Sequence, residues 1–303
     1  MSVDTMSQTS AARPGAAAGP ARWAGSSRRR TSVWRVLAVV TLVVLAAAWL
    51  VPFLWNILTS FKSEQDAVMV PVQLLPDNGF TIEAYRRVIS QGNLVVWFTN
   101  SVVVAVAVTV LTVVISALAA YGFSRMLFRG RRLLLAITLA SIMVPGQLLI
   151  VPLFRQMASF DLVDTYWGVI LPQLVHPVIV YILKKFFDGI PRELEESARI
   201  DGAGPLRIFA SIVLPLSRPV LAAVSIFIFI GAWNNFLWPF IVTNNPVLMT
   251  LPVGLANVRS GYGLQYAQNS AAAFLAALPL LVVFVFFQRQ IVRGVATTGL
   301  GGQ

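Results

Sequence analysis

The sequence predicts an all-α, polytopic membrane protein with six transmembrane helices. Of its 303 residues, 57% are hydrophobic and only 12% are charged, about half the charged share of an ordinary soluble domain. The apolar residues also gather in six segments, each close to the ~20 residues that a helix needs to cross a hydrocarbon core. The predicted spans are 36–58, 95–123, 133–153, 165–183, 219–242 and 267–287.

Residues 1–32, which precede the first span, are rich in Ala, Gly, Pro, Ser and Arg. They contain too few large apolar side chains to offset the entropy of ordering them, so we expect a disordered, basic cytoplasmic tail. The arginines at 28–30 resemble the start of a signal peptide, but the uncharged run 36–61 is too long and has no clear A-x-A site. We therefore predict a retained first membrane helix.

The membrane domain is predicted over 33–288, followed by a cytoplasmic tail over 289–303. Its fourth span is the shortest, and Pro172 and Pro177 should kink it, because proline removes a backbone donor. The limits of the fifth span are less defined, since no charged residue lies between Arg218 and Arg259.

The distribution of Lys and Arg predicts the orientation in the membrane. If the N-terminus is inside, 18 of the 23 basic residues fall in cytoplasmic segments: six through position 35, four at 125–132, six at 184–218 and two after 288. Cytoplasmic loops carry such an excess of positive charge. Both termini are therefore expected in the cytoplasm of a cell-membrane protein. The net charge of +11 is explained in this way, without nucleic acid as a partner.

The composition argues against an enzyme and against a resident cofactor or metal. The chain has no Cys and one His, which excludes thiolate metal sites and cysteine nucleophiles. It has neither a G-x-x-x-x-G-K-[ST] loop nor an H-E-x-x-H motif. Any energy source is therefore expected on another polypeptide.

The longest outer loop, about 62–93, ends in the amphipathic stretch TIEAYRRVI. Two interpretations stay open: a surface hairpin with a short interfacial helix, or a surface on which a partner docks.

A polar, acidic stretch over 188–218 should lie in the cytoplasm between spans four and five. Pro191 suits a first helical turn, and three glutamates follow where a helix N-terminus favours negative charge. Gly202 is able to adopt the left-handed conformation that ends a helix, and Pro205 to begin the next one. The sequence predicts a helix, a sharp turn and a second amphipathic helix.

This stretch resembles the EAA loop of ABC importer permeases, because E-S-A-R-I-D-G-A is followed eight residues later by I-V-L-P. The matching positions are Glu196, Ser197, Ala198 and Gly202, with Asp201 and Ala203 also fitting. Ser197 departs from the usual Ala but keeps a small side chain. On pattern alone, a solvated loop with two short helices stays an alternative.

The resemblance implies a type I ABC importer permease fold and a role in coupling. In that family the first short helix docks in a groove of a cytoplasmic ATPase. The implied partners are a second related permease, two ATPase subunits, which bind ATP and Mg²⁺, and an extracytoplasmic solute-binding protein. Small side chains at Ser197 and Ala198 would allow close approach, Glu196 would face a basic partner, and Gly202 would set the direction of the helix.

Three further patterns are similar to the carbohydrate branch of that family, the maltose-transporter type: FIGAWNNFLWPFIVTNN, TLPVGL at 250–255 and QRQIVRGVATTG at 288–299. In relatives of this type, a loop near 250–265 enters the mouth of the binding protein, and a glycine-bearing tail lies between the ATPase subunits. A simple turn and a frayed terminus are the alternatives here.

The fifth span contains polar and aromatic residues that are candidates for the translocation pathway: Trp233, Asn234, Asn235 and Trp238. Amides in hydrocarbon either bond a neighbouring helix or line a wet cavity, so interhelical bonding is the alternative. His176, with Gln173 one turn earlier, is typical of helix packing more than of a proton relay. Asn100 and Gln147 are interpreted in the same way.

The sequence thus predicts a permease subunit of a binding-protein-dependent ABC importer for a sugar or sugar-like solute. An importer for phosphate or an amino acid is the alternative within the family. An ion-coupled secondary transporter is a weaker alternative, because no acidic or basic residue occupies the middle of any predicted span.

Overall fold

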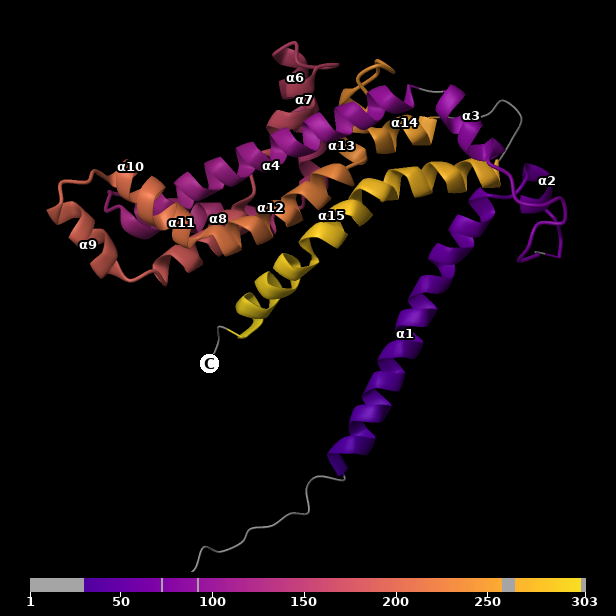
Figure 1. The fold of residues 1–303 in the computed structure, drawn as a ribbon. Helices are drawn as coiled ribbons and strands as arrows, with labels where there is room; N and C mark the ends of the chain where they lie inside the picture. Colours follow the sequence, from indigo (N-terminus) through magenta and orange to yellow (C-terminus); the bar gives the residue numbers. More distant parts are fainter. Residues whose placement is uncertain (1–29, 72, 92, 258–264, 301–303) are drawn as a thin grey trace, which may run out of the picture. The chain divides into compact units, whose positions relative to one another are not determined.

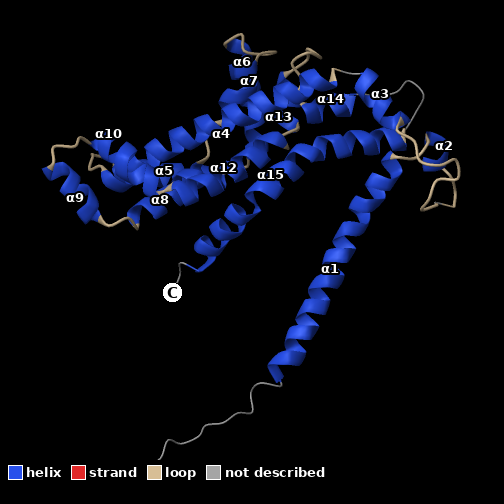
Figure 2. Cartoon of the chain, viewed as in Figure 1, coloured by secondary structure: helices blue, strands red, loops and turns tan. Residues whose placement is uncertain are grey.

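The structure is a computed structural model that describes residues 30–71, 73–91, 93–257 and 265–300. The regular structure of these residues is entirely helical (Figure 2). The chain divides into two units, 1–53 and 54–303, which are each described by themselves. The predicted tail 1–32 lies almost wholly outside the described residues.

Within the described residues, three helices are long and apolar enough to cross a membrane unbroken: α1 (Arg30–Ser60), α4 (Leu94–Arg125) and α15 (Tyr266–Leu300). They correspond to the first, second and sixth predicted spans, which are confirmed as helices. The backbone of α15 stays helical through the segment predicted as a tail, up to Leu300.

The third predicted span is not one helix. It consists of α5 (Arg131–Ala140), the short 3₁₀ turns η1 (Ser141–Met143) and η2 (Gly146–Leu149), and α6 (Ile150–Ser159), and it bends by 96°. The cause is Pro145, which disfavours a helical conformation at the preceding residue. Val144 accordingly has ψ 115°. The prediction of a continuous helix over 133–153 was therefore wrong.

The kink predicted in the fourth span is confirmed. This span consists of α7 (Tyr166–Ile170), a 3₁₀ turn η3 (Leu171–Gln173) and α8 (Pro177–Asp188), and it bends by 51°. Pro177 begins α8, and His176 before it has the non-helical angles φ −126° and ψ 86°, as expected for a residue that precedes proline.

The fifth predicted span is also divided, into α12 (Arg218–Trp233) and α13 (Leu237–Val242). Pro239 explains the break, because its ring excludes the carbonyl of Asn235, four residues earlier, from a regular helix. A continuous helix over 219–242 was thus wrong. The described residues give six spans only if each pair of helices joined by a sharp bend is counted as one span. In one of these pairs, α12 follows the helical segment Pro205–Leu216 at a bend of 80°.

Seven shorter elements complete the described residues: α2 (Glu64–Ala67), α3 (Glu83–Gln91), α9 (Arg192–Ile200), α10 (Pro205–Ile208), the π-helical turn η4 (Phe209–Val213), α11 (Leu214–Leu216) and α14 (Leu251–Asn257).

Helix α4 is the centre of the core of the second unit, where it packs mainly against α8 and α12 (Figure 1). Its buried residues recur every three or four positions along the whole helix: Trp97, Asn100, Ser101, Val104, Ala105, Val108, Thr112, Ser116, Ala117, Ala120, Tyr121 and Ser124. Most of the central ones are small, which lets helices approach closely. Larger side chains such as Leu183, Phe187 and Ile228 fill the space opposite.

Candidate coupling site and outer loops

The segment 188–218 folds as the predicted helix, turn and second helix. Pro191 is the N-cap of α9, and Glu193 and Glu195 lie in its first turn. After Asp201, Gly202 has φ +80°. The Gly202 amide donates to the Arg199 carbonyl, and the Ala203 amide to the Ala198 carbonyl. This pair of bonds is a Schellman motif, which requires a left-handed residue at the glycine position.

The second helix begins at Pro205 and packs inward. Gly204 is its N-cap, and Pro205 occupies the first turn, where a missing N–H costs nothing. Ile208, Phe209 and Val213 are buried. The predicted apolar face is thus present, although the middle of the helix is a π-helical turn.

The candidate coupling residues lie mostly on the surface. Glu196, Ser197, Asp201 and Gly202 are exposed, and Ala198 and Ala203 are partly buried. Ile200, one turn after Ser197, is 87% exposed. A single exposed apolar side chain is common on protein surfaces; on α9 it lies beside the exposed Glu196 and Ser197.

Glu195, which the sequence analysis did not single out, is instead buried. Its carboxylate pairs with Arg125 at 3.0 Å, and both side chains are only 4% exposed. Arg125, the last residue of α4, also donates to the carbonyls of Phe187 and Ile190, the latter at 2.6 Å. The one sequence signal is the Glu195-Glu196 pair: neighbours on a helix point about 100° apart, so they cannot both face the same partner.

Two more side chains of α4 contact this segment. Ser124 donates to Asp188 Oδ1 at 2.7 Å, and Lys184 donates to Asp188 Oδ2, also at 2.7 Å. Tyr121 donates to the Pro205 carbonyl at 3.1 Å. The C-terminal end of α4 therefore binds segment 188–218 at three places: before α9, within α9 and after α9.

The four pathway candidates in the fifth span have different surroundings. Trp233 and Trp238 are buried and donate to carbonyls of other helices, Ala276 at 3.2 Å and Gly168 at 3.1 Å. Asn235 donates to the side-chain oxygen of Gln173 at 2.7 Å.

Asn234 is exposed and bonds only within its own helix, to Ile230 at 3.0 Å. Three of the four residues thus make interhelical bonds, and one presents its amide on the surface.

The N-terminal end of α4 holds the loop that follows α13. Trp97 donates to the Pro246 carbonyl at 2.6 Å. Asn100 donates to the Val247 and Met249 carbonyls at 2.8 and 2.9 Å. Further bonds come from Ser101, which accepts from the Leu251 amide; Tyr166, which donates to Asn100; and Asp164, which accepts from the Asn244 and Asn245 amides.

Close packing limits what fits at this end. A Cβ on Gly254 of α14 would lie 2.1 Å from the Trp97 ring, so only glycine allows this approach. Of the segment 250–265, residues 258–264 lie outside the described part of the chain.

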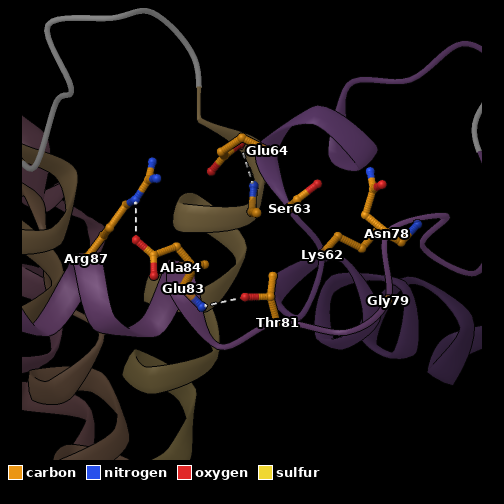
Figure 3. A pocket seen from close by; sticks show the side chains of 10 residues that line it. Lys62, Ser63, Glu64, Asn78, Gly79, Thr81, Glu83, Ala84 and Arg87 are labelled. Atoms are coloured by element: carbon orange, nitrogen blue, oxygen red, sulfur yellow. Dashed lines mark hydrogen bonds and ion pairs between the residues drawn. The ribbon is translucent and has the colours of Figure 1, made fainter.

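The outer loop 62–93 closes over the start of α15. Glu64 accepts hydrogen bonds from the amides of Ala267 and Gln268, at 3.2 and 2.8 Å. Between this loop and α15 lies a pocket of about 210 Å³. In Figure 3, Glu83 bonds both Arg87 and the Thr81 hydroxyl at its edge. The predicted short helix is α3.

Comparison with known proteins identifies the family to which this fold corresponds. Residues 112–297 match the family described as "Binding-protein-dependent transport system inner membrane component". The arabinooligosaccharides transport system permease protein AraQ of Bacillus subtilis is 34% identical over 89% of this chain and 97% of its own. The diacetylchitobiose uptake system permease protein NgcG of Streptomyces coelicolor is 36% identical over 91% of each chain.

A solved structure has the same fold. It is a chain of a bacterial ABC transporter involved in the import of the acidic polysaccharide alginate, with a TM-score of 0.76 and 22% identity. The match covers 88% of this chain and 99% of that one. The predicted permease fold is confirmed, with its third and fifth spans broken rather than continuous.

Proposed function

The chain belongs to the family of inner membrane components of binding-protein-dependent transport systems, and we propose that the solute it carries is a sugar or sugar-like molecule. It is a membrane-embedded importer subunit that works with a solute-binding protein. The names of the relatives AraQ and NgcG, which refer to arabinooligosaccharides and diacetylchitobiose, support the choice of a carbohydrate.

The proposed assembly contains a second related permease and two ATPase subunits, which bind ATP and Mg²⁺. This chain supplies no catalytic residue. Segment 188–218 faces the cytoplasm together with both termini, as the excess of Lys and Arg in these segments supports. Loop 62–93 and the loop after α13 then face the solute-binding protein.

The observation that carries the coupling role is the exposed face of α9. Glu196, Ser197 and Ile200 lie at helical spacing on one side, while Glu195 on the other side is buried. The face offers a small side chain for close approach, a carboxylate for a basic partner and an apolar group that water solvates poorly. Asp201, Gly202 and Ala203 end the helix rigidly, so that a force on α9 moves it as a unit.

The pathway is proposed to pass the break between α12 and α13. A helix break brings amide groups and irregular backbone to membrane depth, and such groups suit sugar hydroxyls where they line a cavity. Asn234, whose side chain is exposed, is the candidate for direct contact. Trp233, Asn235 and Trp238 hold the break in place through their bonds to other helices.

Cysteine crosslinking tests the coupling role, because the chain has no cysteine of its own. We expect Ser197→Cys to crosslink to an ATPase subunit in assembled transporter. Ser159→Cys, which is also exposed but lies at the end of α6, should not. Absence of any crosslink from position 197, with the ATPase present in the complex, would rule out this docking face.

Uptake of labelled saccharides into vesicles that contain the full transporter tests the solute. ATP-dependent uptake of a saccharide supports the proposal. Uptake of only phosphate or an amino acid would contradict it.

A further inference from the structure

Arg125 contacts three neighbouring parts of the segment 187–195, which lies more than 60 residues further along the chain. Its guanidinium contacts the Phe187 carbonyl in α8, the Ile190 carbonyl in the turn before α9, and the Glu195 carboxylate in α9 itself. Its Nη2 group donates to both carbonyls, and its Nε forms the ion pair with Glu195. A planar guanidinium presents its nitrogens in several fixed directions, so different nitrogens face different partners. No Lys has this geometry.

The position of Arg125 on α4 adds to this attachment. Tyr121, Ser124 and Arg125 are three and four residues apart, so they lie on one face. Tyr121 bonds Pro205, beyond the turn that ends α9, and Ser124 bonds Asp188, before α9 begins. The chain is therefore attached to the C-terminal end of α4 on both sides of α9.

The same face of α4 reaches the opposite end of the core without interruption. The buried stripe continues from Tyr121 to Asn100 and Trp97, which hold the backbone of the loop after α13. Figure 1 shows α9 near one end of α4, and α14 near the other. A 32-residue helix is about 48 Å long.

We propose that Arg125 is a positioning residue that fixes the coupling helix α9 to α4 through Glu195, so that movement of α9 is carried by α4 to the loop after α13. The proposal rests on the coupling role proposed above. Its physical basis is that an ion pair buried to this degree separates only if a charge is left unpaired in the interior. A flexible loop would absorb the displacement instead of passing it on.

A distance measurement tests the attachment directly. Spin labels at Leu127→Cys, just after α4, and Leu194→Cys, on α9, report their separation in the assembled transporter, with partner cysteines replaced. We expect one narrow distance distribution in the otherwise unchanged chain and a broader or shifted one with Glu195→Gln. The control is Glu83→Gln, which removes a similar Glu–Arg pair that is exposed by 51% and 42%, and it should leave the distribution unchanged.

Measurements of ATP hydrolysis test whether this attachment couples α9 to the outer side of the transporter. We expect the ratio of ATP hydrolysis with and without the loaded binding protein to fall at least about fivefold in Glu195→Gln and Arg125→Gln. Arg125→Lys, which keeps a positive charge beside Glu195, should retain a higher ratio than Arg125→Gln. Equal ratios for these two variants would overturn the role of the ion pair, even if Glu195→Gln fails to assemble.

The outcomes separate this inference from the proposed function. An unchanged distance distribution in Glu195→Gln, together with a normal hydrolysis ratio, would overturn the attachment while leaving the ATPase partner in place. A chain that binds no ATPase at all would refute the coupling role. The label distance measured on that chain alone would still decide whether Glu195 fixes α9 to α4.

Discussion

The two ends of α4 hold their neighbouring segments by different chemistry. At the C-terminal end, the contacts involve charged groups: Arg125 with Glu195, and Ser124 with an Asp188 that also binds Lys184. At the N-terminal end, neutral donors, an indole and an amide, bind main-chain carbonyls. At the first end, α9 itself is attached through the side chain of Glu195, with bonds to backbone carbonyls on either side of it; the second end attaches an irregular loop through its backbone.

The difference follows from what each segment leaves unsatisfied. The carbonyls at 246–249 lie in a loop and lack regular helical partners, so they need donors from side chains. Helix α9 already bonds its own backbone, so only side chains are available to attach it. One buried pair attaches α9 itself, and other bonds from α4 hold the chain before and after it, whereas the loop is held by several neutral bonds of similar strength. We expect the charged end to depend on one residue and the neutral end to tolerate the loss of one bond.

Arg125→Ala should therefore be the most damaging substitution of the two ends. Among the described residues it leaves the buried Glu195 carboxylate with one longer ion pair, to the mostly exposed Arg199 at 3.9 Å. Removing one member of a buried ion pair costs about 3 to 5 kcal/mol. Thermal unfolding of the detergent-solubilised subunit measures the loss. R125A/E195A should recover part of the stability, because no unpaired charge remains. If Arg125→Ala were as stable as the unchanged chain, the Arg125–Glu195 pair would not hold the segment at the C-terminal end of α4.

The coupling segment was predictable from sequence because local chemistry determines it. Pro191, Gly202 and Pro205 each act within a few residues: one precedes the first turn, one has the left-handed conformation, and one begins the second helix. The partner of Glu195 was not predictable, since Arg125 is 70 residues away and only the packing of α4 against α8 brings them together.

The broken spans show a second kind of limit. Pro145 and Pro239 were visible in the sequence, yet hydropathy averages over a window and does not register one residue that ends a helix. The buried stripe of α4 is likewise invisible to hydropathy, because Val106, Val110 and Val114 on the other face are equally apolar and exposed. Small and hydroxyl residues at three- and four-residue spacing are the signal that would have revealed it.

Asn100→Ala tests the neutral end and should have a smaller effect. It leaves the Val247 and Met249 carbonyls without their amide donor and removes the acceptor of the Tyr166 hydroxyl. The expected loss is about 1 to 3 kcal/mol in the same unfolding measurement. Thr99→Ala is the matched control, because Thr99 is exposed and bonds only its own helix at Val95. A loss as large as that of Arg125→Ala would remove the contrast between the two ends.

Gly202→Val should have the smallest effect on stability, because it strains the turn after α9 without removing a contact. A Cβ at this position meets no atom within 4 Å, so the cost comes only from φ +80°, about 1 to 2 kcal/mol for a residue with a side chain. The control is Gly204→Val, since Gly204 has φ −72° and ψ 165°, which valine adopts readily before a proline. We expect Gly202→Val to reach the membrane and bind the ATPase but to transport less per hydrolysed ATP, because α9 no longer ends in a fixed direction. Equal transport efficiency in the two variants would mean that the anchor at Glu195 alone orients the coupling helix, and that its Schellman turn is dispensable.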